Sequence, residues 1–257
     1  MAHIISVVNQ KGGVGKTTTT LNLAAYLADA GKFVLLIDLD PQANATSGVG
    51  IDHRALAAGV YEGLIGTHSV RSLIHPTAHD GLSILPATGA LAGASAELVN
   101  AEEREHFLRK ALLEVRNDYD YILIDNQPSL GMLTINGLVA SDSVLIPVQA
   151  EFYALEGLTD LMNTVNLVRE NLKPNLEIMG AVITMYDSRT KLSKEVLQEL
   201  YRYFPDKIFR SVIPRSVRLA EAPSFGKTIL GYDPSSKAAK AYERLAKEFI
   251  LREQGAL

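Results

Sequence analysis

The sequence predicts a doubly wound α/β fold, in which helices flank a mostly parallel β-sheet. Three observations lead to this prediction. Short apolar runs alternate with longer amphipathic stretches along the chain of 257 residues, most of these runs are apolar at every position, and a glycine-rich turn joins the first run to the first amphipathic stretch. Such alternation is typical of strand–helix–strand units, and strands covered on both faces are apolar throughout. Right-handed crossovers in this fold place the ligand beyond the carboxyl ends of the strands.

Seven apolar runs are the expected strands. They are His3–Val8, Lys32–Asp38, Leu82–Pro86, Tyr121–Asp125, Ser143–Val148, Glu177–Thr184 and Lys207–Ile213. The helical patterns are clearest at Lys16–Ala30, Glu102–Val115, Leu155–Asn171 and Leu192–Phe204, and a last helix is expected at Ser235–Arg252. Because the composition shows no linker-like change, we expect one domain over residues 1–257.

The composition excludes several classes of protein. The chain has no cysteine, which rules out structural disulfides, cysteine-ligated zinc, iron–sulfur clusters and thiol catalysis. Its first residues lack the basic and then apolar pattern of a signal peptide, and no apolar run reaches the roughly 20 residues that span a bilayer. We therefore expect a cytoplasmic protein with no membrane segment.

The turn after the first expected strand is the strongest motif. It reads Asn9-Gln10-Lys11-Gly12-Gly13-Val14-Gly15-Lys16-Thr17-Thr18 and opens a helix. Its glycines let backbone N–H groups converge on phosphate oxygens, and the helix N-terminus adds its positive end. Lys16 is expected to reach the β- and γ-phosphates of a nucleotide, and the Thr17 hydroxyl is expected to bind Mg²⁺.

Two common glycine patterns do not fit this turn. The dinucleotide fingerprint requires a third glycine where the chain has Thr18, and the standard P-loop requires a first glycine where it has Gln10. The remaining pattern is the deviant form K-G-G-x-G-K-[ST], in which Lys11 is an additional lysine. Lys11 is poorly placed to bind the phosphates of its own nucleotide, but it can reach a second one across a face-to-face dimer and act there as an arginine finger does. The alternative is a solvated loop lysine.

Carboxylates are expected next to this turn. Asp38 and Asp40 end the second strand, and alternation places both on one face. One carboxylate can hold Mg²⁺ through water, and the other can orient the water that attacks the γ-phosphate. Asp125 ends another apolar run. The alternative for Asp38 and Asp40 is an ordinary turn at a strand end.

Five segments together resemble the ParA family of deviant Walker-type ATPases, which are P-loop NTPases, and among them the short Soj-like type. They are Lys11–Thr18, Leu36–Asn44, Pro147–Gly157, Ile213–Arg215 and Glu221–Gly226. The resemblance implies that Asp40 activates water, that Asp38 lies near the metal, and that Asp125 is the Walker B carboxylate. It also implies that Pro214 and Arg215 lie near the adenine, although Pro214 can equally be a strand terminator. The family commonly reads Asp-x-Pro-Pro from the Walker B position, whereas this chain has Gln127, which frees an N–H and loosens φ.

The resemblance further implies the activity and the partners. It implies slow ATP hydrolysis with ATP and Mg²⁺, an ATP-dependent homodimer that binds double-stranded DNA nonspecifically at the nucleoid, and release after hydrolysis stimulated by a ParB-type partner. The alternative is a membrane-cycling ATPase of the MinD kind. Such proteins end in a basic amphipathic helix, whereas residues 242–254 of this chain mix both charges.

Positive charge is concentrated in the last third of the chain. Residues 186–240 contain eleven Lys and Arg against six Asp and Glu, although the whole chain has a net charge of −4. This asymmetry indicates an anionic partner, and the resemblance points to DNA. The expected contacts are Arg189, Lys191, Arg215 and Arg218, with Arg189 and Arg218 foremost. The alternative is that these are ordinary solvated helix faces.

Overall fold

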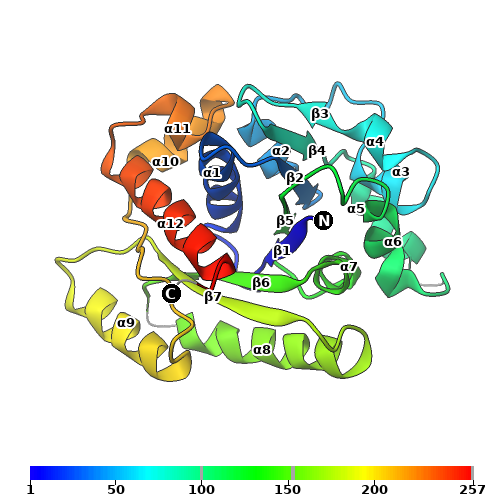
Figure 1. The fold of residues 1–257 in the computed structure, drawn as a ribbon. Coiled ribbons are helices and arrows are strands. Elements are labelled where there is room, and N and C mark those ends of the chain that lie inside the picture. Colours follow the sequence, from blue (N-terminus) through cyan, green and yellow to red (C-terminus); the bar gives the residue numbers. More distant parts are fainter. Residues whose placement is uncertain (99–100, 152–153, 256–257) are drawn as a thin grey trace.

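The computed structural model describes residues 1–98, 101–151 and 154–255 (Figure 1). Phe152 and Tyr153, which belong to one of the segments behind the family resemblance, lie outside these residues. No helix in the described part of the chain is long and apolar enough to cross a membrane.

One seven-stranded sheet runs through the described residues. Its strands are β1 (His3–Val7), β2 (Val34–Leu39), β3 (His75–Pro76), β4 (Leu82–Leu85), β5 (Tyr121–Asn126), β6 (Ser143–Gln149) and β7 (Glu177–Thr184), in the order β3-β4-β2-β5-β1-β6-β7. Every neighbouring pair is parallel except β3 with β4. The predicted doubly wound, mostly parallel sheet is confirmed.

Helices cover both faces of the sheet (Figure 1). They are α1 (Lys16–Asp29), α2 (Asn44–Gly48), α3 (Val60–Leu64), α4 (Val70–Leu73), α5 (Leu91–Leu98), α6 (Phe107–Leu112), α7 (Met132–Ala140), α8 (Ala154–Asn171), α9 (Lys191–Tyr203), α10 (Val217–Glu221), α11 (Ile229–Tyr232) and α12 (Lys237–Glu253), with 3₁₀ turns η1 (Arg104–His106) and η2 (Ala222–Phe225). On one face α1, α2, α11 and α12 share a core with alternate strand residues, while α3 to α9 cover the other. Successive side chains of a strand point to opposite faces. Because both faces are covered by helices, most positions of these strands are buried, which explains the continuously apolar runs.

The C-terminal helix α12 packs against α1 (Figure 1). Its buried residues include Tyr242, Leu245 and Phe249, and the Phe249 ring meets Tyr121 edge-on at 5.3 Å. Since this apolar face lies in the core of the fold, it is not presented to a surface outside the chain.

Two expected elements are wrong in part. Residues Lys207–Ile213 form no strand, although bridges join Ile208 to Ala181 and Pro214 to Tyr186. The N–H groups of Phe209 and Ile213 still donate to Ala181 and Ile183 of β7. Between them, the N–H groups of Arg210 and Ser211 donate to the Glu248 carboxylate at 2.7 and 2.9 Å, and this interrupts the ladder.

The expected helix Glu102–Val115 is the other correction. Only η1 and α6 form there. Glu103 has a φ of 51°, and this left-handed conformation cannot continue a right-handed helix.

Candidate functional site

The loop between β1 and α1 lies at the carboxyl ends of the central strands. Gly13 and Gly15 have φ angles of 75° and 85°, in the region that side chains rarely adopt. Gly15 directly precedes α1, so the unpaired N–H groups of the first helical turn open onto this loop. The loop therefore needs glycine at both positions, and its geometry suits an anion.

Two side chains from outside the glycines hold the loop. Asn9 donates from Nδ2 to the carbonyl oxygen of Pro147 at 2.8 Å and accepts at Oδ1 from the Lys11 N–H at 3.0 Å. Thr184 Oγ1 donates to the carbonyl oxygen of Val14 at 2.7 Å. The ends of β6 and β7 thus fix the path of the loop.

Lys16 is buried, and its Nζ donates to the carbonyl oxygen of Lys11 at 3.1 Å. Burial lowers the pKa of this ammonium group, while Asp125 and Asp40 act to raise it. The amine therefore lies under the loop, close to two carboxylates.

Asp125 is fully buried at the end of β5. Its two oxygens accept from Thr17 Oγ1 at 2.7 Å and from Thr20 Oγ1 at 3.0 Å. Burial, and then the nearby Asp38, raise the pKa of this carboxyl to about 7. The structure thus joins the Walker B position to the first turn of α1.

Asp38 lies directly opposite Asp125 in the pairing of β2 with β5 and is also fully buried. Its Oδ2 accepts from the Thr46 N–H at 2.8 Å and from Thr46 Oγ1 at 2.7 Å, and its Oδ1 accepts from the Asp40 N–H at 3.2 Å. Burial raises the pKa of Asp38 to about 6, although these hydrogen bonds act to lower it. Asp38 lies behind the site rather than on its surface.

Asp40 follows β2 and lines a hollow of about 560 Å³ together with the phosphate loop. Its Oδ1 accepts from the Gln42 N–H at 2.9 Å. Of the three predicted carboxylates, Asp40 alone lines this hollow, which also exposes Thr17 and Lys16.

A second hollow, of about 210 Å³, adjoins the first. Both are lined by Gly15, Thr18 and Met185. The second hollow is mostly apolar and includes Pro214 and Arg215. The two together form a cleft with a polar, N–H-rich end and an apolar end.

The residues of this cleft fit a nucleotide with Mg²⁺. The glycine loop offers N–H groups to phosphate, and the nearby oxygen donors are the hard ligands that Mg²⁺ prefers. No group of three His, Asp or Glu side chains within the described residues could hold a metal by itself. Mg²⁺ usually keeps several waters and takes further ligands from substrate phosphates, so a sparse donor set suits it.

The Lys11 side chain is half-buried and is not among the residues that line the cleft. No carboxylate of the described residues forms an ion pair with its Nζ. Gly12 is exposed, and the nearest atom that an added Cβ would meet among the described residues, the adjoining ones apart, is Pro128 Cβ at 3.9 Å. Among the described residues, no ion pair of Lys11 and no close packing against Gly12 accounts for these two positions.

The loop after Asp125 lies over the phosphate loop, because Pro128 lines the same hollow. The buried Asn126 holds this segment by donating from Nδ2 to the carbonyl oxygens of Val7 at 3.1 Å and Ile124 at 3.2 Å. With Gln127 two positions further on, the Asp125 carboxylate keeps its contacts with Thr17 and Thr20.

Two of the expected DNA contacts, Arg189 and Arg215, lie close together. The Tyr186 N–H donates to the carbonyl oxygen of Ile213, and the Arg215 N–H donates to the carbonyl oxygen of Tyr186. These bonds hold the segment that carries Arg189 beside the segment that carries Arg215. Arg189 chelates Asp187 with Nε and Nη2 at 2.9 and 2.7 Å, and this guanidinium holds the pKa of Asp187 at about 2. Arg215 lies 3.4 Å from Glu151.

Lys191 and Arg218 are paired as well. Lys191 lies 3.1 Å from Glu195, and Arg218 lies 3.1 Å from Glu221 and 3.6 Å from Asp233. All four expected cations are exposed. Each has an acidic neighbour, so in this conformation they do not form a surface of unbalanced positive charge.

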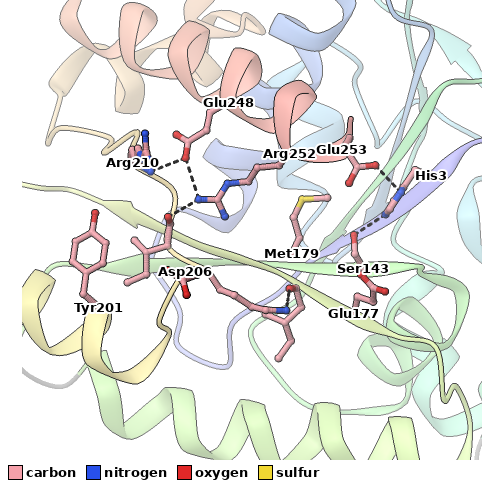
Figure 2. Close-up of a pocket in the computed structure, with 13 residues that line it drawn as sticks. His3, Ser143, Glu177, Met179, Tyr201, Asp206, Arg210, Glu248, Arg252 and Glu253 are labelled. Carbon is pink, nitrogen blue, oxygen red and sulfur yellow. Dashed lines mark hydrogen bonds and ion pairs between the residues drawn. The ribbon is translucent and has the colours of Figure 1, made fainter. Parts of the chain in front are cut away.

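A hollow of about 790 Å³ lies at the opposite end of the strands, where β1, β6 and β7 begin (Figure 2). The charged groups in its walls pair with one another. His3 hydrogen-bonds to Ser143 at 2.8 Å and lies 2.7 Å from the Glu253 carboxylate, and Arg252 forms an ion pair with Glu248 at 3.1 Å. It contains none of the predicted site residues.

The segment after α2 is in contact with the segment after η2. Beyond α2, Gly50 meets Gly226 so closely that a Cβ on Gly226 would lie 2.7 Å from Gly50 Cα. Both glycines have positive φ angles, 87° and 63°. Their backbones therefore touch with no side chain between them.

Sequence reasoning missed the residues that support the site. They are Asn9, Thr20, Thr46, Thr184 and Met185. Thr20 has a signal in its i, i+3 spacing from Thr17, which places both hydroxyls on one helix face. Thr46 and Thr184 come from distant segments and have no such signal.

Comparison with known proteins gives the family. A model described as an AAA domain matches residues 2–178. The chain is 54% identical over 248 residues to the sporulation initiation inhibitor protein Soj of Bacillus subtilis, covering 96% of this chain and 98% of that protein. It is 49% identical over 253 residues to the chromosome partitioning protein ParA of Myxococcus xanthus, covering 98% and 89%.

A solved structure agrees with the fold. Cobyrinic acid a,c-diamide synthase from Mycobacterium smegmatis with bound ADP and magnesium superposes with a TM-score of 0.89 at 35% identity, covering 100% of this chain and 97% of that chain. With about half of its residues identical to those of Soj and ParA proteins over nearly the whole length, this chain belongs to the Soj/ParA family of chromosome-partitioning ATPases.

Proposed function

We propose that this chain, acting as one domain, is an ATP-hydrolysing switch for DNA segregation. Two copies close around two ATP molecules, the dimer binds DNA without sequence preference, and hydrolysis stimulated by a ParB-type partner releases it. The observation that supports this most is the cleft itself, in which the glycine loop, Lys16, Thr17 and Asp40 share one hollow.

The phosphate end is assigned to the loop residues Gly12, Gly13, Val14, Gly15 and Thr18. Their N–H groups bind phosphate oxygens, and the Lys16 ammonium balances charge on the β- and γ-phosphates. The Thr17 hydroxyl would bind Mg²⁺ directly, and Asp125, which accepts from that hydroxyl, would hold it through water. The enclosed Asp38 would add negative charge behind the ion. Bound Mg²⁺ neutralises charge that develops on the phosphates.

Hydrolysis is assigned to Asp40 and Lys11. The Asp40 carboxylate faces the hollow and orients the attacking water. The Lys11 side chain, which does not line its own cleft, contacts the γ-phosphate held by the second copy. Because catalysis then needs both copies, an isolated chain hydrolyses ATP slowly.

The base end of the nucleotide is assigned to the smaller hollow. Pro214 offers a rigid apolar face, and Arg215 lies beside it. The hollow adjoins the phosphate loop through Gly15 and Thr18, as one extended ligand requires.

DNA binding is assigned to Arg189, Lys191, Arg215 and Arg218. All four are exposed, and dimerisation doubles the number of phosphate contacts. By this proposal the ATP-bound protein associates with the nucleoid. The acidic neighbours of these cations suggest weak DNA binding by the single chain.

Sedimentation with DNA tests the proposal. Retention should require ATP, should be absent with ADP or without nucleotide, and should fall steeply between two salt concentrations, because each phosphate contact releases counterions. Equal retention in all three nucleotide states would refute the switch.

A MinD-like membrane cycle is the alternative. The packing of α12 into the core speaks against it, and flotation with anionic liposomes and ATP decides between them. We expect the protein to remain at the bottom of the gradient.

A further inference from the structure

The hydroxyl of Thr46 lies at the junction of three segments around the site. Thr46 belongs to α2 and is fully buried. Its Oγ1 donates to Asp38 Oδ2 at 2.7 Å and accepts from the N–H of Ala87 at 3.0 Å. A hydroxyl has a single hydrogen, so with the Ala87 N–H on its oxygen, that hydrogen is directed to Asp38.

The same contact closes a loop around Asp40. Asp38 accepts from both the N–H and the hydroxyl of Thr46 and, on its other oxygen, from the N–H of Asp40. The carbonyl oxygen of Asp40 accepts from the N–H of Ala43, which precedes α2 and has a φ of 53°. The turn that carries Asp40 is thus held at both ends by the Asp38–Thr46 pair.

The two buried carboxylates are supported differently. Asp125 accepts hydrogen bonds from two hydroxyls of α1, those of Thr17 and Thr20. Asp38 receives its only side-chain hydroxyl within the described residues from Thr46. The position of Asp38 therefore depends on α2 and the segment after β4, and not on the phosphate loop.

We propose that Thr46 is a positioning residue for ATP hydrolysis: it holds Asp38 and the turn beyond it, and so sets the direction of the Asp40 carboxylate. The proposal rests on the proposed function, because the rate that it concerns is that of ATP hydrolysis. Thr46 does not line the cleft, so it acts through Asp38 and not on the nucleotide.

Two pairs of variants isolate the hydroxyl. Thr46→Val has nearly the same shape as the parent but lacks the hydroxyl, and Thr46→Ser and Thr46→Ala differ from each other by that oxygen alone. Displacing a reacting group by about 1 Å costs on the order of 100-fold in rate. We expect Thr46→Val and Thr46→Ala to lose about 10- to 100-fold in kcat with the Kd for ATP within about threefold of the parent, and Thr46→Ser to recover most of the rate.

Thr88 offers a matched control. Its hydroxyl oxygen is also buried and has no hydrogen-bond partner among the described residues. Thr88→Val therefore removes a buried hydroxyl next to Ala87 without touching Asp38. We expect its kcat to equal that of the parent.

Combining Thr46→Val with Asp40→Ala tests whether Thr46 acts on the rate through Asp40. Residues that act through one group are not additive, so Thr46→Val should cause no further loss of rate in the Asp40→Ala background. Equal kcat in Thr46→Val and the parent, or a full additional loss in the double variant, would overturn the proposal. So would variants without the hydroxyl that fail to fold while Thr46→Ser behaves as the parent, because the hydroxyl would then serve folding. A parent that never hydrolyses ATP would instead refute the proposed function itself.

Discussion

The ammonium group of Lys16 and the carbonyl oxygen of Lys11 are 3.1 Å apart and joined by a hydrogen bond. The two lysines of the phosphate loop are therefore connected, one through its side chain and the other through its backbone. Asn9 fixes the N–H of the same Lys11 residue, so its backbone is held from both sides while its side chain is left for another contact.

Lys16→Ala should abolish nucleotide binding, because it removes both the buried charge and the contact that supports the loop. We expect the Kd for ATP, measured by calorimetry, to rise at least about 100-fold, as expected for loss of a charge-assisted contact of roughly 3 kcal/mol. Lys11→Ala is the control and should bind ATP within about threefold of the parent. Unchanged affinity in Lys16→Ala would contradict the assignment of the loop.

Gly12→Val should fold and bind ATP as one copy but fail to dimerise. Space exists for the side chain within the chain, since the first neighbour of a Cβ is 3.9 Å away, whereas a second copy would approach this exposed position closely. Light scattering with ATP in the Asp40→Ala background would report the mass. A full-sized dimer would show that Gly12 does not face the partner.

Asp40→Ala should keep ATP-dependent dimerisation and lose turnover by about 100-fold or more, a cost typical of a positioned general base. Phosphate release and light scattering on the same sample measure the two properties. Parental turnover would show that another group orients the water.

Replacing both Arg189 and Arg218 by Glu should weaken ATP-dependent DNA retention by about 10-fold or more at low salt, while ATP-dependent dimerisation is unchanged. Asp187→Asn is a control that should change DNA retention in the opposite direction. It frees Arg189 from its chelating carboxylate, so we expect stronger retention. If neither variant alters retention, the DNA contacts lie elsewhere.

The stability of the nucleotide-free protein should fall as pH rises through the range in which Asp38 and Asp125 ionise. Their pKa values, about 6 and about 7, are higher than the roughly 3.9 of an unfolded aspartate. Between about pH 4 and pH 7 the folded chain therefore binds more protons than the unfolded chain. The contribution of these two groups to the free energy of unfolding is fully present below about pH 4 and is lost as pH rises through 6 and 7.

The difference between the parent and Asp125→Asn measures this effect. Burial lowers the pKa of His79, which acts in the opposite direction and is common to both proteins. We expect the parental Tm to fall by on the order of 4 °C more than that of Asp125→Asn between pH 6 and pH 8. Parallel Tm curves would show that Asp125 titrates normally.

The sheet could be predicted because its strands are covered on both faces and are therefore apolar at every position. Six of the seven expected strands form at or near the predicted bounds. The run Lys207–Ile213 forms no strand, because Glu248 from α12 takes the N–H groups of Arg210 and Ser211 in its middle. A contact between residues 37 or more positions apart leaves no local pattern.

The candidate site also has a part that the sequence predicts and a part that it does not. The phosphate loop was predictable because its glycines and lysine are consecutive, and the structure brings Lys16, Thr17 and Asp40 into one hollow. The expectation that Asp38 and Asp40 share a face told nothing of their surroundings, in which Asp38 is enclosed by Thr46 and Asp40 is open to the cleft. Charge counting likewise could not reveal that the expected DNA-binding cations each have an acidic neighbour.

The contact of Gly50 with Gly226 has a mechanical consequence. Two backbones that touch directly have no compressible side chain between them, so neither loop can shift towards the other without pushing it. Gly50 follows α2, which carries Thr46, and Gly226 follows η2. A displacement of α2 would therefore press directly on the backbone that follows η2, with no side chain to absorb it.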